Sequence, residues 1–281
     1  SPLSLRRYEN RLSACAPGPT ALNPANPVDL RIPGLQRPLQ LYVHGAQDRF
    51  VSRRIREEGS WEPFETSLVL SLLRPGDVFV DVGANVGYFS VLAASVVGAK
   101  GAVFAFEPDP DNYRLLQANA ELNGQGHCIT AVEAALSDAS GEGQLFLSAD
   151  NLGDHQVYAG DERRRSVPIA LLDGGKYLAP RLQRLDLLKV DTQGSEHQVM
   201  AGLALLLTGL AQPPRIIIEL PPHSLRQAGA SGRALIELLA TLGQPMWIID
   251  HIEGRLAASS AEELALWCDN WDAVAEARGF M

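Results

Sequence analysis

The segment from Val78 to Pro108 constrains the fold of this chain more than any other stretch. It reads VFVDVGANVGYFSVLAASVVGAKGAVFAFEP, which is the order of an apolar strand, a glycine turn, an apolar helix and a second strand with an acidic end. A unit of this order places two parallel strands side by side, and ligands bind at the carboxyl ends of such strands. We therefore expect an α/β domain with a ligand pocket near Asp81 and Glu107.

The spacing of the glycines separates two kinds of nucleotide ligand. Enzymes that bind dinucleotides use G-x-G-x-x-G, whose middle glycine lets the backbone approach a pyrophosphate. The turn here, DVGANVG over residues 81–87, lacks that glycine and carries a carboxylate that would repel a phosphate. S-adenosylmethionine fits this pattern, because it is cationic at its ammonium and sulfonium, and Glu107 can accept hydrogen bonds from its ribose hydroxyls. The alternative is that Gly83 and Gly87 only permit a tight turn and that Glu107 is a solvated strand end.

Composition narrows the class of protein further. A chain of 281 residues with 46% hydrophobic residues can bury a sizeable core. Its 33 acidic and 24 basic residues give a net charge of -9, which argues against a nucleic-acid partner, because such proteins present a basic face. Three distant cysteines, Cys15, Cys128 and Cys268, favour neither a disulfide framework nor a zinc site. Without a long apolar run or a secretory signal, we expect a soluble cytoplasmic protein that contacts no membrane.

The remaining pattern predicts two parts. Residues 1–65 form a proline-rich arm and cap, because the prolines of its lead exclude a regular helix. Residues 66–281 alternate between strands and helices, with a β-rich insert at about residues 142–172 and a hairpin near the end. This alternation predicts a doubly wound, mostly parallel sheet of about seven strands with a terminal antiparallel hairpin.

Acidic residues follow three further predicted strands, at the edge of the sheet where ligands bind. A strand over about residues 128–136 is followed by Ser137 and Asp138, and a carboxylate there can accept a hydrogen bond from an adenine amine. Aspartate is equally typical of a turn at this position. Asp191 and Glu219 end the next two predicted strands, which places both carboxylates beside the same pocket.

Several segments together resemble the FkbM family of S-adenosylmethionine-dependent methyltransferases. They are VFVDVGANVGYFS, FAFEPDPDNYRLLQANAELN, AALSD, LLKVDTQGSEHQVMAGL and IIIELPP, within about residues 61–222. The most family-specific part is K-x-D-x-[EQ]-G-x-E, present here as KVDTQGSE from Lys189 to Glu196. Gln193 replaces the commoner glutamate, so the sequence gives no support for a divalent metal, although one is possible. Ser195 with Gln198 predicts a capping box for the helix that follows.

The resemblance implies a Rossmann-like class I methyltransferase fold and O-methylation of a hydroxyl on a sugar or polyketide-like small molecule. It also implies three groups of donor-binding residues. These are Asp81, Gly83, Asn85 and Gly87 for the methionine end, Glu107 with Pro108 for the ribose, and Ser137 with Asp138 for the adenine.

Methyl transfer to a hydroxyl needs little besides positioning and a base for the hydroxyl proton. Asp191, Glu219 and His155 are the candidates for that base, and the ordinary pKa of histidine suits proton transfer near neutral pH. Trp61, Glu62 and Gln193 are expected near the acceptor, although Trp61 and Glu62 also fit a packing residue and a helix-start glutamate. Two rival functions use the same architecture: a nicotinamide-dependent oxidoreductase and a non-catalytic module that binds S-adenosylmethionine.

Overall fold

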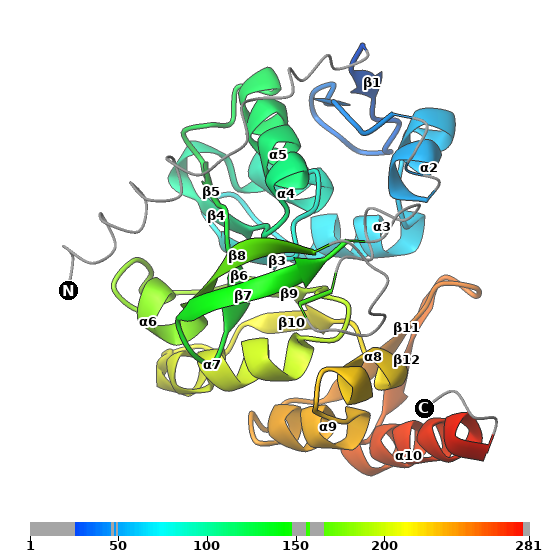
Figure 1. Ribbon diagram of the computed structural model, residues 1–281. Coiled ribbons are helices and arrows are strands. Elements are labelled where there is room, and N and C mark those ends of the chain that lie inside the picture. The colour runs from blue at the N-terminus through cyan, green and yellow to red at the C-terminus, as the bar shows by residue number, and fades with distance from the viewer. Residues whose placement is uncertain (1–25, 46–47, 49, 148–155, 158–165, 278–281) are drawn as a thin grey trace.

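A five-stranded parallel sheet forms the centre of the molecule (Figure 1). The structure is a computed structural model that describes residues 26–45, 48, 50–147, 156–157 and 166–277. Every pair of neighbouring strands in this sheet is parallel. In spatial order the strands are β10 (Arg215–Ile218), β9 (Leu187–Val190), β3 (Val78–Val82), β4 (Ala102–Phe106) and β5 (Ile129–Val132).

The order of the strands predicts where a ligand binds. The chain runs from β3 outward to β4 and β5, and then returns to β9 on the other side of β3. The strand order therefore reverses between β3 and β9. Ligands of open α/β sheets bind outside the carboxyl ends of the strands at such a reversal.

Alternating side chains divide the core into two layers, one on each face of the sheet (Figure 1). On β3, Phe79 packs with the cluster under one set of helices, and the next residue, Val80, packs with the cluster under the other set. The sheet is covered on both faces, which confirms the expected doubly wound α/β class. The first face carries α3 (Pro63–Leu72), α4 (Tyr88–Val97) with the short 3-10 helix η1 (Gly98–Lys100), and α5 (Pro110–Leu122), and the second carries α6 (Gly174–Leu178), α7 (Glu196–Gly209) and α9 (Gly232–Ala240).

Asparagines on α5 hold the described part of the amino-terminal segment. This segment contains the two-stranded ribbon β1 (Val28–Asp29) and β2 (Gln40–Leu41), followed by α2 (Val51–Glu58). Asn123 bonds both the N–H and the C=O of Gln40, and Asn119 does the same for Tyr42. The amide of Asn119 also donates to the carbonyl of Val86 in the glycine turn. The division of the chain at residue 65 stays a prediction, and the lead before residue 26 lies outside the described residues.

The strand expected over residues 128–136 is two strands in different sheets. β5 ends at Val132, where a tight turn lets the N–H of Ala134 donate to the Val132 carbonyl. β6 (Ala135–Ser137) then pairs with β8 (Ser166–Asp173), which also pairs with β7 (Gly141–Phe146). The prediction that Ser137 and Asp138 end the third strand of the central sheet is therefore wrong, because an apolar run does not reveal a turn within it.

The carboxyl-terminal part consists of α8 (Pro222–Gln227), a hairpin and a long helix. The hairpin strands β11 (Met246–Asp250) and β12 (Arg255–Ser259) pair only with each other in the described part of the chain. The central sheet there has five strands rather than the seven expected. Helix α10 (Ala261–Ala277) closes the described chain. None of the helices in the described ranges is long and apolar enough to cross a membrane.

Replacing Asn119 by alanine tests the attachment of the amino-terminal segment. Asn119 is fully buried, and its loss leaves the N–H and C=O of Tyr42 and the C=O of Val86 without their partner. We expect Asn119→Ala to lower the free energy of unfolding by about 2–4 kcal/mol in urea denaturation. Gln117→Ala on the exposed face of the same helix is the control. Equal unfolding midpoints for the two variants would contradict this role.

Candidate active site

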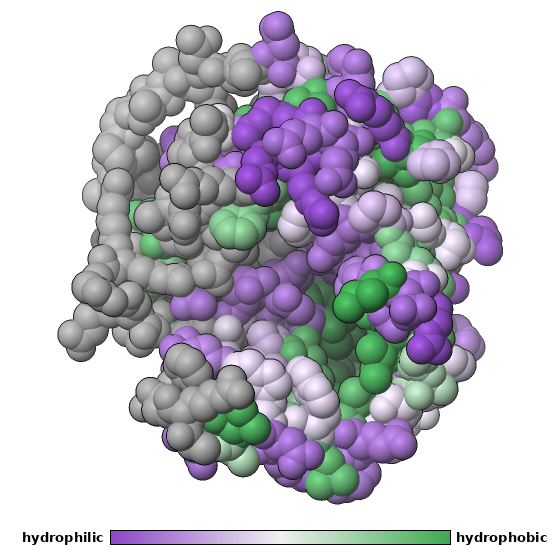
Figure 2. All heavy atoms as spheres, turned by 90° about the vertical axis from the view of Figure 1, so that its right-hand side faces the viewer, coloured by the Kyte–Doolittle hydropathy of each residue, from purple (hydrophilic) through white to green (hydrophobic). Residues whose placement is uncertain are grey.

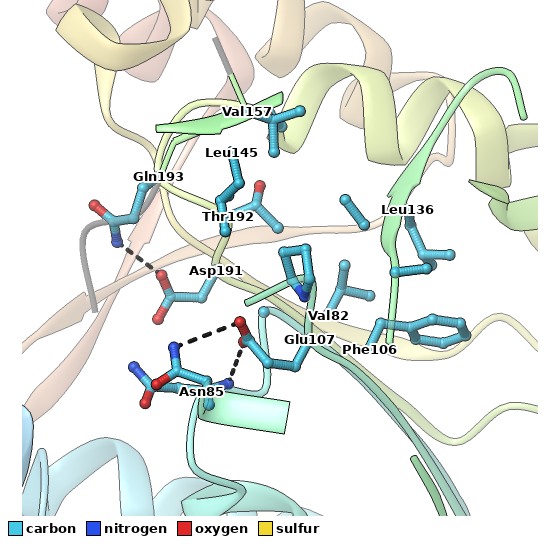
Figure 3. A pocket seen from close by; sticks show the side chains of 16 residues that line it. Val82, Asn85, Phe106, Glu107, Leu136, Leu145, Val157, Asp191, Thr192 and Gln193 are labelled. Atoms are coloured by element: carbon cyan, nitrogen blue, oxygen red, sulfur yellow. Dashed lines mark hydrogen bonds between the residues drawn. The ribbon is translucent and has the colours of Figure 1, made fainter. Parts of the chain in front are cut away.

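A pocket of about 530 Å³, including its open mouth, lies at the carboxyl ends of β3, β4 and β9 (Figure 3). This is the place that the reversal of strand order predicts. One end of the pocket is apolar and the other is polar. Figure 3 shows Phe106 and Leu136 on one side and Asp191, Thr192 and Gln193 on the other, with Leu145 and Val157 drawn close to Thr192.

The glycine turn after β3 forms one wall of the pocket and requires glycine at two positions. Gly83 and Gly87 have φ angles of 84° and 87°. A Cβ at Gly83 would collide with the carbonyl oxygen of Asp191, and one at Gly87 would collide with the side chain of Leu116. Asn85 also has a positive φ of 52°, and its side-chain oxygen accepts a hydrogen bond from the next N–H. The turn therefore brings backbone close to the pocket at Gly83 and Asn85, which both line it.

Glu107, at the end of β4, places a carboxyl group on the pocket wall (Figure 3). It is 5% exposed and accepts hydrogen bonds from the N–H of Asn85 at 2.7 Å and of Asp109 at 2.9 Å. Desolvation, followed by the charge of Asp109, raises the pKa of Glu107 to about 8. Pro108 and Asn112 line the pocket beside it. A carboxylate has about four acceptor positions, so Glu107 can bind further donors such as ribose hydroxyls.

Asp81 and Lys189 form the centre of an ionic cluster beneath the pocket. They are paired in register on adjacent strands and are 1% and 3% exposed. The Lys189 ammonium lies 3.0 Å from Asp191 and 3.6 Å from Glu65, and 4.6 Å from the ring centroid of Phe89. Burial alone would lower the pKa of Lys189, but the carboxylates of Asp191, Glu65 and Asp81 raise it above its ordinary value. The lysine is therefore a permanent cation.

Asp81 is not among the residues that line the pocket. Its carboxylate accepts a hydrogen bond from the hydroxyl of Ser90 at 2.6 Å. Desolvation raises the pKa of Asp81 to about 6, although Lys189 and Ser90 act in the opposite direction. The expected contact between Asp81 and a cationic ligand stays a prediction, and so does the contact expected of Gly87.

Gln193 connects the two carboxylates at the polar end. Its amide nitrogen donates to Asp191 at 2.9 Å (Figure 3) and to Glu219 at 2.8 Å. Its φ angle of 56° is unusual for a residue other than glycine. A glutamate at this position would place a third acceptor where donors are needed. The amide in place of the commoner glutamate therefore fits its surroundings.

Asp191 and Glu219 differ in acidity. Burial opposes ionisation of Asp191, but the charge of Lys189 and hydrogen bonds from its neighbours bring its pKa below the ordinary value. Desolvation of the carboxyl group and then the charge of Asp191 raise the pKa of Glu219 well above its ordinary range. Glu219 is an exposed residue, but its carboxyl group faces Gln193. Of the two carboxyl groups, Asp191 is therefore the stronger acid.

Glu196 holds the turn that presents Asp191 and Gln193. Its fully buried carboxylate accepts hydrogen bonds from the N–H groups of Thr192 and Gly194, both at 2.9 Å. The predicted capping box of Ser195 and Gln198 is wrong. Ser195 makes no side-chain cap, and the amide of Gln198 donates instead to the carbonyl of Ala228. Glu196 thus satisfies N–H groups of the turn that precedes the helix, and not those of the first turn of α7.

The segment before α3 brings a further carboxyl group to the polar end. The N–H of Trp61 donates to the hydroxyl of Tyr88 at 3.0 Å, which anchors the segment to the start of α4. The next residue, Glu62, has a φ angle of 42°. Desolvation and the charges of Glu65 and Asp191 raise the pKa of Glu62 to about 7, while Lys189 lowers it. Glu62 therefore lies within electrostatic reach of Asp191.

Backbone strain is concentrated at this site. The residues other than glycine with positive φ in the described ranges are Glu62, Asn85 and Gln193. Asn85 and Gln193 line the pocket, and Glu62 lies within electrostatic reach of Asp191. Such conformations cost about 1–3 kcal/mol each and persist where the surrounding structure enforces them, which is common at functional sites.

Six of the predicted site residues line the pocket, namely Gly83, Asn85, Glu107, Pro108, Asp191 and Gln193, whereas Asp81, Gly87, Ser137, Asp138, Trp61, Glu62 and Glu219 do not. Asp138 is exposed and accepts a hydrogen bond from its neighbour Ser137 at 3.2 Å, and the same segment contributes Ala134, Ala135 and Leu136 to the pocket instead. His155 lies outside the described residues. Within the described ranges, no group of three or more histidine, cysteine, aspartate or glutamate residues could hold a metal ion.

Replacing Lys189 by methionine tests the ionic cluster. The variant leaves Asp81 and Glu65 buried without their cation and removes the partner of the partly exposed Asp191, so we expect a loss of about 3–5 kcal/mol in the free energy of unfolding at pH 8. The pKa of Asp81, which desolvation already raises, then rises further above that of the unfolded chain, so folding takes up a proton and the loss shrinks as the pH falls to 5.5. The free energies of unfolding of the parent chain and of Lys189→Met, measured by denaturation at pH 8 and at pH 5.5, test this prediction.

The matched control is Lys176→Met, which removes an exposed ion pair with Asp173. It is expected to cost less than about 1 kcal/mol at either pH. A Lys189→Met variant as stable as this control at pH 8 would contradict the account of the cluster.

Comparison with known proteins places this geometry in a family. The methyltransferase FkbM domain matches residues 81–244. The chain is 28% identical over 184 residues to the hexuronic acid methyltransferase AglP of Haloferax volcanii. The matched segment covers 63% of this chain and 72% of that protein. It is also 29% identical over 163 residues to the 31-O-demethyl-FK506 methyltransferase FkbM of Streptomyces tacrolimicus. That match covers 47% of this chain and 61% of the Streptomyces protein.

A crystal structure of an FkbM methyltransferase from Methylobacillus flagellatus is similar to this structure with a TM-score of 0.40 and 14% identity, over 66% of this chain and 48% of that one. The chain thus spans less than two thirds of the Streptomyces relative's length. The family domain covers more than half of the 281 residues and includes the glycine turn, Glu107 and the turn from Asp191 to Glu196. The chain therefore belongs to the FkbM methyltransferase family.

Proposed function

We propose that the pocket binds S-adenosylmethionine and that the chain transfers its methyl group to a hydroxyl of a sugar or polyketide-like small molecule. The observation that carries this proposal is the position of Glu107, a desolvated carboxyl group on the pocket wall beside a glycine turn. Ribose hydroxyls can donate to that carboxylate. The names of the two relatives, which act on a hexuronic acid and on an FK506 precursor, agree with this class of reaction.

The two ends of the pocket suit the two ends of the donor. Phe106, Leu136 and Leu145 give an apolar surface on which an adenine ring can lie. Gly83 and Asn85 line the pocket between Glu107 and the polar end. We expect the methionine part of the donor to lie against their backbone. Ser137 and Asp138, which do not line the pocket, are less suitable for the adenine than the apolar residues just before them. When bound, the donor supplies an electrophilic methyl group.

Asp191 is the base that the directions of the pKa shifts favour. A base must be unprotonated before the reaction, and the pKa of Asp191 is lowered whereas that of Glu219 is raised. Asp191 also lines the pocket, so it can accept the proton of an acceptor hydroxyl held there. Gln193 fixes the carboxylate by its hydrogen bond and also donates to Glu219. A role for His155 stays a prediction.

The charges at the polar end favour a neutral acceptor. Glu62, Glu65, Asp191 and Glu219 lie around the buried cation Lys189, and of these four carboxyl groups Asp191 lines the pocket. No lysine or arginine is among the described residues of the lining, so an anionic acceptor would meet the charge of Asp191 there, and like charges at short range are costly. We therefore propose a hydroxyl on a neutral molecule rather than on a uronic acid, and Trp61 and Glu62 as the acceptor-side wall.

The first rival, a nicotinamide-dependent oxidoreductase, is disfavoured by the glycine turn. The turn lacks the middle glycine that would let the backbone approach a pyrophosphate. The second rival, a non-catalytic binding module, is disfavoured by two carboxyl groups with pKa values shifted in opposite directions and bonded to the same strained residue, Gln193.

Donor binding is expected to strengthen with pH because of Glu107. Its carboxyl group is largely neutral at pH 6.5, whereas ribose hydroxyls donate best to the ionised form. We expect the affinity for S-adenosylhomocysteine, measured by calorimetry, to rise roughly tenfold or more from pH 6.5 to pH 8.5. Glu107→Gln should bind more weakly and lose this rise. A pH-independent affinity in the parent chain, or thermal stabilisation by NAD instead, would contradict the proposal.

Turnover is expected to depend on the charge of Asp191. Asp191→Asn should keep the affinity for S-adenosylhomocysteine within a few fold but lower methyl transfer to a panel of neutral glycosides and macrolides by roughly 10²–10⁴-fold. The control is Asp138→Asn, an exposed carboxylate outside the pocket, which should change neither quantity. If the Asp191→Asn variant transferred methyl groups as fast as the parent chain, Asp191 would not be the base.

A further inference from the structure

Exposed apolar side chains are concentrated in one part of the chain. Ten large hydrophobic residues are exposed in the described ranges, and eight of them lie between residues 247 and 274, beyond the family domain that ends at residue 244. Single exposed apolar residues are ordinary, whereas a cluster marks an interaction site. We name this cluster the C-terminal apolar face; it consists of Trp247, Ile248, Ile252, Leu256, Leu266, Trp267, Trp271 and Val274.

One side of helix α10 is buried, and another side is exposed. Ala265, Cys268 and Asp272 are buried against α8 and α9. Trp267, Trp271 and Val274 are spaced by four and three residues and remain exposed. Residues at this spacing lie on one side of a helix. The exposed side of α10 is therefore an apolar stripe of the kind that packs on another helix or sheet.

The hairpin β11–β12 is the second half of this surface. None of its ten strand residues is fully buried, and in the described part of the chain its strands pair only with each other. Isolated hairpins are marginally stable, and an open edge that carries apolar residues is a template for a further strand. Figure 2 shows the side of the molecule that carries the hairpin and α10, with hydrophobic residues gathered around a hollow in its lower half.

The acidic residues of α10 are only partly balanced within the chain. Asp269 pairs with Arg233 of α9 at 2.6 Å, and Glu276 pairs with Arg226 of α8 at 2.9 Å. The same two arginines also pair with Glu262 and Asp272, and Glu263 accepts a hydrogen bond from the N–H of Ser260. The apolar side chains must therefore carry any contact of this surface, because the carboxylates outnumber the arginines and the whole chain carries a net charge of -9. An anionic membrane, by contrast, would require exposed cations on the rim.

We propose that the C-terminal apolar face is the surface on which a second copy of this chain docks. Ile248 follows Trp247 directly in β11 and points to the opposite face of the hairpin, so it adds nothing to this contact. Half-exposed large side chains offer roughly 100 Å² each, so the other seven residues provide about 700 Å², which is close to one side of a standard interface. A two-fold axis brings the same patch of each copy together, which suits an apolar surface. Strand pairing between the open hairpin edges would extend the contact.

Sedimentation velocity on the whole chain tests this proposal. The parent chain should sediment at twice its monomer mass of 30.3 kDa at micromolar concentration. Trp267→Glu combined with Trp271→Glu should sediment as a monomer and keep the thermal shift produced by S-adenosylhomocysteine. The matched control is Leu205→Glu on α7, because Leu205 is 89% exposed but lies outside the C-terminal apolar face. This control should remain dimeric.

A second variant, Ile252→Glu at the hairpin tip, guards against misfolding of the helix variant and should also weaken the dimer. A parent chain that stays monomeric up to about 100 μM, where even weak specific contacts form, would overturn the proposal. So would a double variant that folds, binds S-adenosylhomocysteine and still dimerises. A monomeric parent that binds lipid vesicles would identify a different occupant and would equally overturn it.

Discussion

The ammonium of Lys189 is the interaction on which the site depends. A buried cation is tolerated only when carboxylates surround it, and here these come from β3, from the start of α3 and from the turn after β9. Asp81, Glu65 and Asp191 thereby connect three segments that are far apart in the sequence. The cation fixes the register of β9 against β3, and it also keeps Asp191 ionised beside the pocket.

The charge of Lys189 also makes the two carboxyl groups of the polar end differ in acidity. Asp191 lies against the lysine and has a lowered pKa, whereas the pKa of Glu219 is raised by desolvation and by the charge of Asp191. An amide at position 193 can donate to both groups, which a glutamate cannot do without a proton of its own. Gln193 thus holds a stronger and a weaker acid close together.

Much of the donor side could be predicted from the sequence, because it is local. The apolar runs, Gly83 and Glu107 lie within thirty residues and specify strand, turn, helix and strand in one unit. The break between β5 and β6 could not be predicted, since the turn at Ala134 interrupts an apolar run without glycine or proline. Because of this break, Ser137 and Asp138 do not line the pocket as expected. The pairing of Asp81 with Lys189 depends on strand register across more than a hundred residues. No local pattern carries that information.

The most direct test is a crystal structure of the chain with S-adenosylhomocysteine. We expect the ribose hydroxyls within hydrogen-bonding distance of Glu107, the adenine against Phe106 and Leu136, and the sulfur at the end of the pocket that holds Asp191. A nucleoside bound elsewhere, or bound in this pocket with its ribose turned away from Glu107, would contradict the account.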